Sequence, residues 1–78
     1  MSPVFLTENG FRFYTWSKEE PRKHIHVIKD EKYCKFWLEP LIELAENKGF
    51  KSFELNQIIK IIKQNEKSFN KKWIEHFG

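Results

Sequence analysis

The chain has 78 residues, of which 40% are hydrophobic and 17% aromatic, and its formal net charge is +3. This length makes one domain with a modest core, and the hydrophobic content excludes a disordered protein. The single cysteine excludes an internal disulfide, and no apolar run approaches the ~20 residues of a membrane span. We therefore expect a cytoplasmic protein that makes no contact with a membrane.

The first predicted element is a β-hairpin around Asn9-Gly10. Both residues tolerate the positive φ angles of a type I′ turn, and apolar segments flank them at residues 4–6 and 11–16. The expected facing pairs are Leu6 with Phe13, Val4 with Thr15, Phe5 with Tyr14, and Thr7 with Arg12. Residues 17–23 are polar, contain a proline and are expected to form a loop.

A second hairpin is predicted over residues 24–38, with Asp30-Glu31 as its turn. The expected facing pairs are Val27 with Cys34, Ile25 with Phe36, His26 with Lys35, and His24 with Trp37. The two hairpins together predict a four-stranded antiparallel sheet over residues 1–38.

Two helices are predicted after the sheet. Residues 41–49 (LIELAENKG) follow a proline and are expected to form a short helix that Gly49 closes. A longer helix is expected over residues 52–77, with a bend or break at Gln64-Asn65. Apolar residues recur there at helical spacing: Leu55, Ile58, Ile59, Ile62, Phe69 and Trp73. The predicted fold is thus a single α+β domain, residues 1–78, with two helices packed on one face of the sheet.

Two helices can cover only one face of such a sheet. The face toward the helices is expected to hold Leu6, Phe11, Phe13, Ile25, Val27, Cys34, Phe36 and Leu38. The other face is expected to carry Phe5, Arg12, Tyr14, Trp16, His24, His26, Tyr33, Lys35 and Trp37. That set is too aromatic for a surface with nothing to bind. The structural alternative is that the strands twist and the loop over residues 17–23 covers part of the set.

Three functions fit this second face. It is suited to binding a partner protein or another copy of the chain, because Trp, Tyr and Arg are enriched at binding hot spots. It also suits RNA, because exposed rings stack bases while basic side chains hold phosphates. The third function is ribonuclease chemistry, with His24 and His26 as acid and base and Lys35 stabilising negative charge. No third ligand accompanies the two histidines, so we expect neither a metal site nor a cofactor.

The chain resembles a family of small bacterial proteins known only as a domain of unknown function. The resemblance rests on Gly10-Phe11-Arg12-Phe13, on His24-Ile25-His26-Val27 after a proline, on Lys35-Phe36-Trp37-Leu38, and on the aromatic-rich end from Trp73. Genes of that family often lie beside a gene for a DNA-binding regulator, an arrangement similar to toxin–antitoxin modules. The resemblance implies an interaction protein whose partner is the product of the adjacent gene. It transfers no active site.

Overall fold

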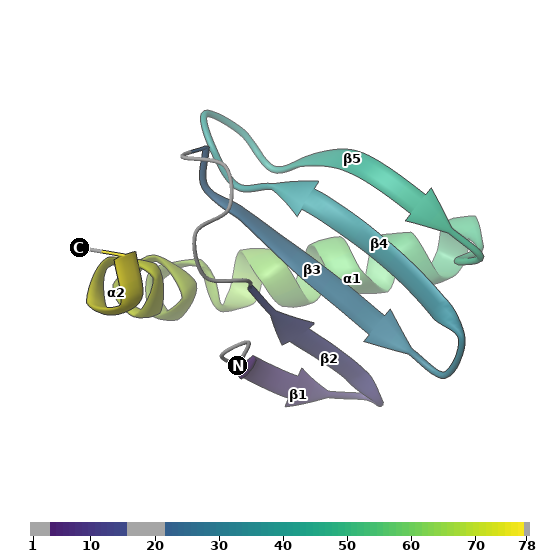
Figure 1. Ribbon diagram of the computed structural model, residues 1–78. Helices are drawn as coiled ribbons and strands as arrows, with labels where there is room; N and C mark the ends of the chain where they lie inside the picture. The colour runs from purple at the N-terminus through teal and green to yellow at the C-terminus, as the bar shows by residue number, and fades with distance from the viewer. Residues whose placement is uncertain (1–3, 16–21, 78) are drawn as a thin grey trace.

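Figure 1 shows the computed structural model, which describes residues 4–15 and 22–77. The elements in chain order are β1 (Val4–Glu8), β2 (Phe11–Tyr14), β3 (His24–Lys29), β4 (Lys32–Trp37), β5 (Glu43–Lys48), α1 (Ser52–Gln64) and α2 (Glu66–Phe77). Each strand pairs antiparallel with its neighbours in sequence, in the order β1-β2-β3-β4-β5. The predicted α+β class and antiparallel sheet are confirmed, and the structure has two helices, although these are not the two predicted segments. The described part of the sheet, however, has five strands instead of four.

The first hairpin turns at Asn9-Gly10, as predicted. The φ angles of these residues are 53° and 82°, the left-handed values that a type I′ turn requires. The predicted pairs of Leu6 with Phe13 and of Thr7 with Arg12 are confirmed.

The outer half of this hairpin differs from the prediction because β1 contains a bulge. The register shifts at Phe5, and Val4 faces Tyr14. The predicted pairs of Phe5 with Tyr14 and of Val4 with Thr15 are therefore wrong. Inserting one residue sends its side chain to the opposite face of the sheet. Phe5 accordingly lies on the helix side, 3% exposed, with its ring centroid 5.9 Å from that of Phe69.

The second hairpin has the predicted register. All four expected pairs are present: His24 with Trp37, Ile25 with Phe36, His26 with Lys35, and Val27 with Cys34. Its turn contains no glycine, and Asp30 adopts the left-handed conformation instead, at φ 56°.

Residues 41–49 are predicted to be a short helix, but most of them instead form β5 (Glu43–Lys48). Leu, Ala, Glu and Lys favour a helix, but each contributes only fractions of a kcal/mol. In the folded chain the backbone pairs with β4, where Glu43 faces Trp37 and Lys48 faces Tyr33. Pairing with an existing sheet edge therefore outweighs the local preference. Gly49, at φ 101°, turns the chain out of β5 toward α1.

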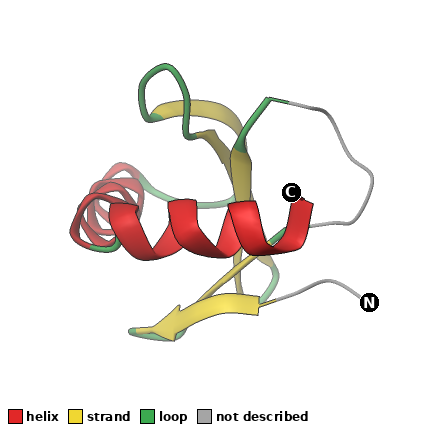
Figure 2. Ribbon diagram, turned by 90° about the vertical axis from the view of Figure 1, so that its left-hand side faces the viewer, coloured by secondary structure: helices red, strands yellow, loops and turns green. Residues whose placement is uncertain are grey.

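The predicted long helix is two helices that meet at Asn65, inside the predicted break. The Asn65 side chain donates to the carbonyl of Ile61 over 2.8 Å, and its backbone N–H donates to the carbonyls of Ile61 and Ile62. These contacts satisfy the last turn of α1. The chain then changes direction, and α2 runs from the α1 side across the end of the sheet to its other side (Figure 2). Neither helix is long and apolar enough to cross a membrane, among the residues that the structure describes.

The core lies between the sheet and α1, and α2 closes one end. The buried cluster consists of Phe5, Phe11, Phe13, Ile25, Val27, Cys34, Phe36, Phe50, Ile58, Ile61, Ile62, Phe69 and Trp73. Trp73 of α2 extends this cluster around the end of the sheet to His24. Burial raises the pKa of the Cys34 thiol to about 12, so the side chain is a neutral, inert part of this core. A partly buried ion pair fixes the other end of α1, where Lys32 Nζ lies 2.7 Å from Glu54 Oε2.

Candidate interaction face

The sheet face opposite α1, called the open face below, holds the predicted site residues. Arg12 is exposed, Tyr14, Tyr33, Lys35 and Trp37 are half-buried, and His24 and His26 are buried at 0% and 3% exposure. Trp16 lies outside the described residues. The structure therefore brings the predicted residues together, but it places both imidazoles beneath their neighbours instead of at the surface.

Tyr14, His26 and Tyr33 form a row of stacked rings across β2, β3 and β4. The ring centroid of His26 lies 5.2 Å from that of Tyr14 and 5.8 Å from that of Tyr33, with interplanar angles of 28° and 26°. The Tyr33 hydroxyl and His26 Nδ1 are hydrogen-bonded at 2.8 Å. The three rings stand side by side on neighbouring strands. Their faces therefore contact one another, and their edges point away from the sheet.

His24 lies in a closed aromatic environment at the end of β3. Its Nδ1 donates to the carbonyl of Arg22 over 2.7 Å; a carbonyl can only accept, so Nδ1 carries the hydrogen. The rings of His26, Trp37 and Trp73 meet it edge-on, with centroids at 5.1, 5.9 and 5.3 Å. Trp73 belongs to α2 and reaches this face because α2 crosses the end of the sheet (Figure 2).

Two cations contact the ring of Trp37. The guanidinium carbon of Arg22 lies 4.2 Å and Lys35 Nζ lies 4.4 Å from the ring centroid, both within cation–π range. Arg22 is also fixed by its Nε, which donates to the Glu39 carbonyl over 2.9 Å, and by Glu43 Oε1 at 3.5 Å.

The charges on the described open face are mainly positive. Its cations are Arg12, Arg22, Lys35 and Lys48, and its carboxylates are Glu43 and Glu46. Glu43 pairs with Arg22, and Glu46 lies 3.2 Å from Lys48. The described cations of this face outnumber its carboxylates, so the face has a positive excess.

Both histidines are held in structural contacts. A general acid or base must lie within hydrogen-bond reach of the substrate, yet both imidazoles are buried, and their Nδ1 atoms are bonded to Arg22 and Tyr33. Among residues 4–15 and 22–77, no three His, Cys, Asp or Glu side chains are grouped so that they could hold a metal ion.

Sequence reasoning missed two contributors to this face, Trp73 and Arg22. The sequence pattern places Trp73 on the apolar stripe of the second predicted helix, and helical spacing alone does not indicate that this helix crosses the end of the sheet. Arg22 falls in the predicted loop over residues 17–23. The sequence feature that could have placed it beside this face is its position two residues before His24, the first residue of the strand.

Comparison with protein families identifies a match over most of the chain. The profile of a family described as a domain of unknown function, DUF4160, matches residues 10–74. This range covers most of the chain, from the first turn to α2, and the chain belongs to that family. No curated protein and no solved structure gives a significant match.

Proposed function

We propose that this member of the DUF4160 family is a small interaction module whose open face binds an acidic segment of a partner protein. The observation that carries the proposal is the cationic arrangement around Trp37. Arg22 and Lys35 lie 4.2 and 4.4 Å from the ring centroid. A half-buried indole bordered by cations combines the residue types of binding hot spots with charge that attracts carboxylates.

The orientation of the rings favours a protein over a nucleic acid. Base stacking needs a ring that presents its face, whereas Tyr14 and Tyr33 turn a face toward His26, and the Trp37 ring already carries two cations. Ribonuclease chemistry is favoured less, because neither histidine is exposed by more than 3%. RNA binding through the same cations is the alternative that the experiment must distinguish.

The resemblance supplies the first partner to test, the protein encoded by the adjacent gene in a toxin–antitoxin-like or regulatory pair. We would titrate the isotope-labelled chain with that protein and, separately, with a mixed single-stranded RNA. The NMR signals of Tyr33, Lys35 and Trp37 would be followed. We expect saturable shifts with the protein, centred on Trp37, and no saturable shifts with RNA.

Charge reversal provides the matched control. Arg12→Glu and Lys35→Glu place a carboxylate on the open face, whereas Lys60→Glu places it on an exposed position of α1. The first two variants should weaken binding by about tenfold each, and Lys60→Glu should leave it unchanged. Circular dichroism would confirm that each variant is folded. Shifts with RNA alone, shifts confined to α1, or an equal loss in all three variants would overturn the proposal.

A further inference from the structure

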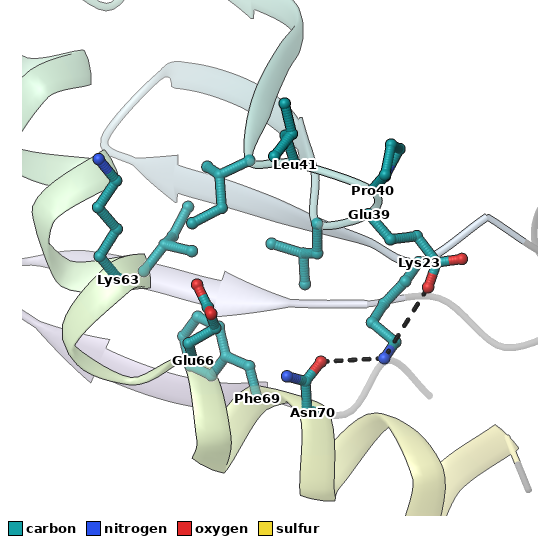
Figure 3. Close-up of a pocket in the computed structure, with 11 residues that line it drawn as sticks. Lys23, Glu39, Pro40, Leu41, Lys63, Glu66, Phe69 and Asn70 are labelled. Atoms are coloured by element: carbon teal, nitrogen blue, oxygen red, sulfur yellow. Dashed lines mark hydrogen bonds and ion pairs between the residues drawn. The ribbon is translucent and has the colours of Figure 1, made fainter.

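A pocket of about 630 Å³ lies at the end of the sheet, between the β4–β5 connection and the junction of α1 with α2. Figure 3 shows its lining side chains. It lies on the helix side of the sheet, because Ile62 and Phe69 of the core form part of its wall. Its residues are separate from those that carry the open face, and its volume is within the usual range of small-molecule sites.

The pocket has an apolar wall that the fold leaves partly open. Leu38 and Ile42 are only half-buried although they pack against the core, and Leu41 at the mouth is 75% exposed. These side chains, with Ile62, form a concave aliphatic surface within one pocket. Such a surface favours a ligand with an aliphatic body.

On one side of the pocket the charge is already paired. Lys23 Nζ donates to Asn70 Oδ1 over 2.9 Å and lies 3.9 Å from Glu39 Oε1, as the dashed lines in Figure 3 show. The Lys23 side chain is 20% exposed. Two oxygens, one from an amide and one from a carboxylate, thus already contact this ammonium within the pocket.

On the other side stands Glu66, the first residue of α2. Figure 3 places its carboxylate beside Phe69 and within the ring of lining residues, while the ammonium of Lys63 extends to the edge of the group. No ion pair joins Glu66 to another residue in the described parts of the chain. The pocket therefore offers a carboxylate next to an aliphatic wall.

We propose that this pocket binds a small aliphatic amine, with its hydrocarbon chain against Leu38, Ile42 and Ile62 and its ammonium beside Glu66. The apolar wall supplies contact area and the carboxylate selects the positive end. This site does not depend on the proposed partner, because the open face and the pocket use different side chains.

The test uses three six-carbon probes that differ only in their end group: hexylamine, hexanol and hexanoate. At pH 7 the amine is cationic, since alkylammonium groups such as that of lysine titrate near ~10.4. We expect hexylamine to give saturable shifts of the Ile42 and Ile62 methyl signals. Hexanol should bind at least about fivefold more weakly, and hexanoate should not saturate. Tighter binding of hexanoate, or equal linear shifts with all three probes, would overturn the proposal.

Two variants test whether the ammonium of bound hexylamine lies beside Glu66. Glu66→Gln should weaken hexylamine to the level of hexanol, whereas Glu75→Gln, an exposed carboxylate further along α2, should leave it unchanged. Unaltered hexylamine binding in folded Glu66→Gln would refute the assignment. N-acetyl-lysine methylamide carries the same ammonium attached to a peptide group. If it bound more tightly than hexylamine, the site would belong to a protein side chain instead of a small molecule.

Discussion

The two faces of the sheet both contain buried side chains, but these are buried by different means. On the α1 side, phenyl and aliphatic side chains such as Phe13, Val27 and Phe36 are packed at 0–1% exposure. On the open face, by contrast, His24 and His26 are buried by rings, and hydrogen bonds to Arg22 and Tyr33 satisfy their Nδ1 atoms.

The two faces should therefore tolerate different substitutions. An apolar core is stabilised by contact area and shape, so its sensitivity depends on the volume that a substitution removes. A buried polar network is directional, so its sensitivity depends on whether a donor or acceptor loses its partner. The expected effects of substitutions separate the two faces accordingly.

The largest effect should come from Phe13→Ala on the α1 side. Phe13 is 0% exposed and its ring centroid lies 5.7 Å from that of Phe69. The cavity should lower the free energy of unfolding by about 3–5 kcal/mol, measured by urea denaturation. Phe53→Ala removes the same ring from a side chain that is 61% exposed and should change it by less than about 0.5 kcal/mol. Similar losses in both variants would contradict this account of the core.

His24→Ala should come next. The substitution leaves the Arg22 carbonyl without its donor and opens space beside Trp37 and Trp73. We expect a loss of about 2 kcal/mol in the same denaturation experiment, together with a change in tryptophan fluorescence. His76→Ala, at an exposed position of α2, is the matched control. A stable His24→Ala protein with unchanged fluorescence would show that the aromatic environment of His24 contributes little.

A smaller effect is expected for Tyr33→Phe, which keeps the ring but removes the hydroxyl bonded to His26 Nδ1. The loss should be about 1 kcal/mol. In a His26→Ala background the same change should cost clearly less, because the hydrogen bond is already absent. Equal costs in the two backgrounds would mean that the hydroxyl acts through another contact.

The smallest effect concerns the dependence of stability on pH at the start of α1. The hydrogen bond from Lys32, followed by the backbone N–H of Lys51, lowers the pKa of Glu54 below its ordinary value of 4.5. A lowered folded-state pKa stabilises the protein above the unfolded value, and this stability is lost as the pH falls through the folded-state pKa. Wild type should therefore exceed Glu54→Gln in stability at pH 7 by more than it does at pH 3. A difference independent of pH would remove this role for Glu54.

Features encoded within a few residues could be predicted from the sequence. Asn9-Gly10 specifies a left-handed turn by its chemistry, the alternation from His24 to Trp37 specifies the register of β3 and β4, and Asn65 interrupts a helical pattern. In each case local physics and the folded structure agree.

Features that depend on distant contacts could not be predicted. The sequence from Glu43 to Lys48 favours a helix locally, and only the free edge of β4 makes it a strand. The bulge at Phe5 is stabilised by the packing against Phe69, 64 positions later in the chain, and by the bond from Lys72 Nζ to the Phe5 carbonyl. For the candidate site, the alternation of side chains along the strand places both histidines on the correct face. It does not indicate that Trp73 contacts this face, and so it does not predict that the histidines are buried.

The path of α2 has a consequence for the order in which the chain can fold during synthesis. This helix supplies Phe69 to the core behind β1 and β2, Lys72 to the backbone of β1, and Trp73 to the opposite face at His24. The packing of the first strand thus requires residues of α2, which the ribosome adds after all five strands and α1. A nascent chain stopped before α2 would carry a sheet open on both faces at one end, exposing apolar surface to aggregation. Folding of this domain is therefore expected to follow translation of α2 instead of accompanying that of the sheet.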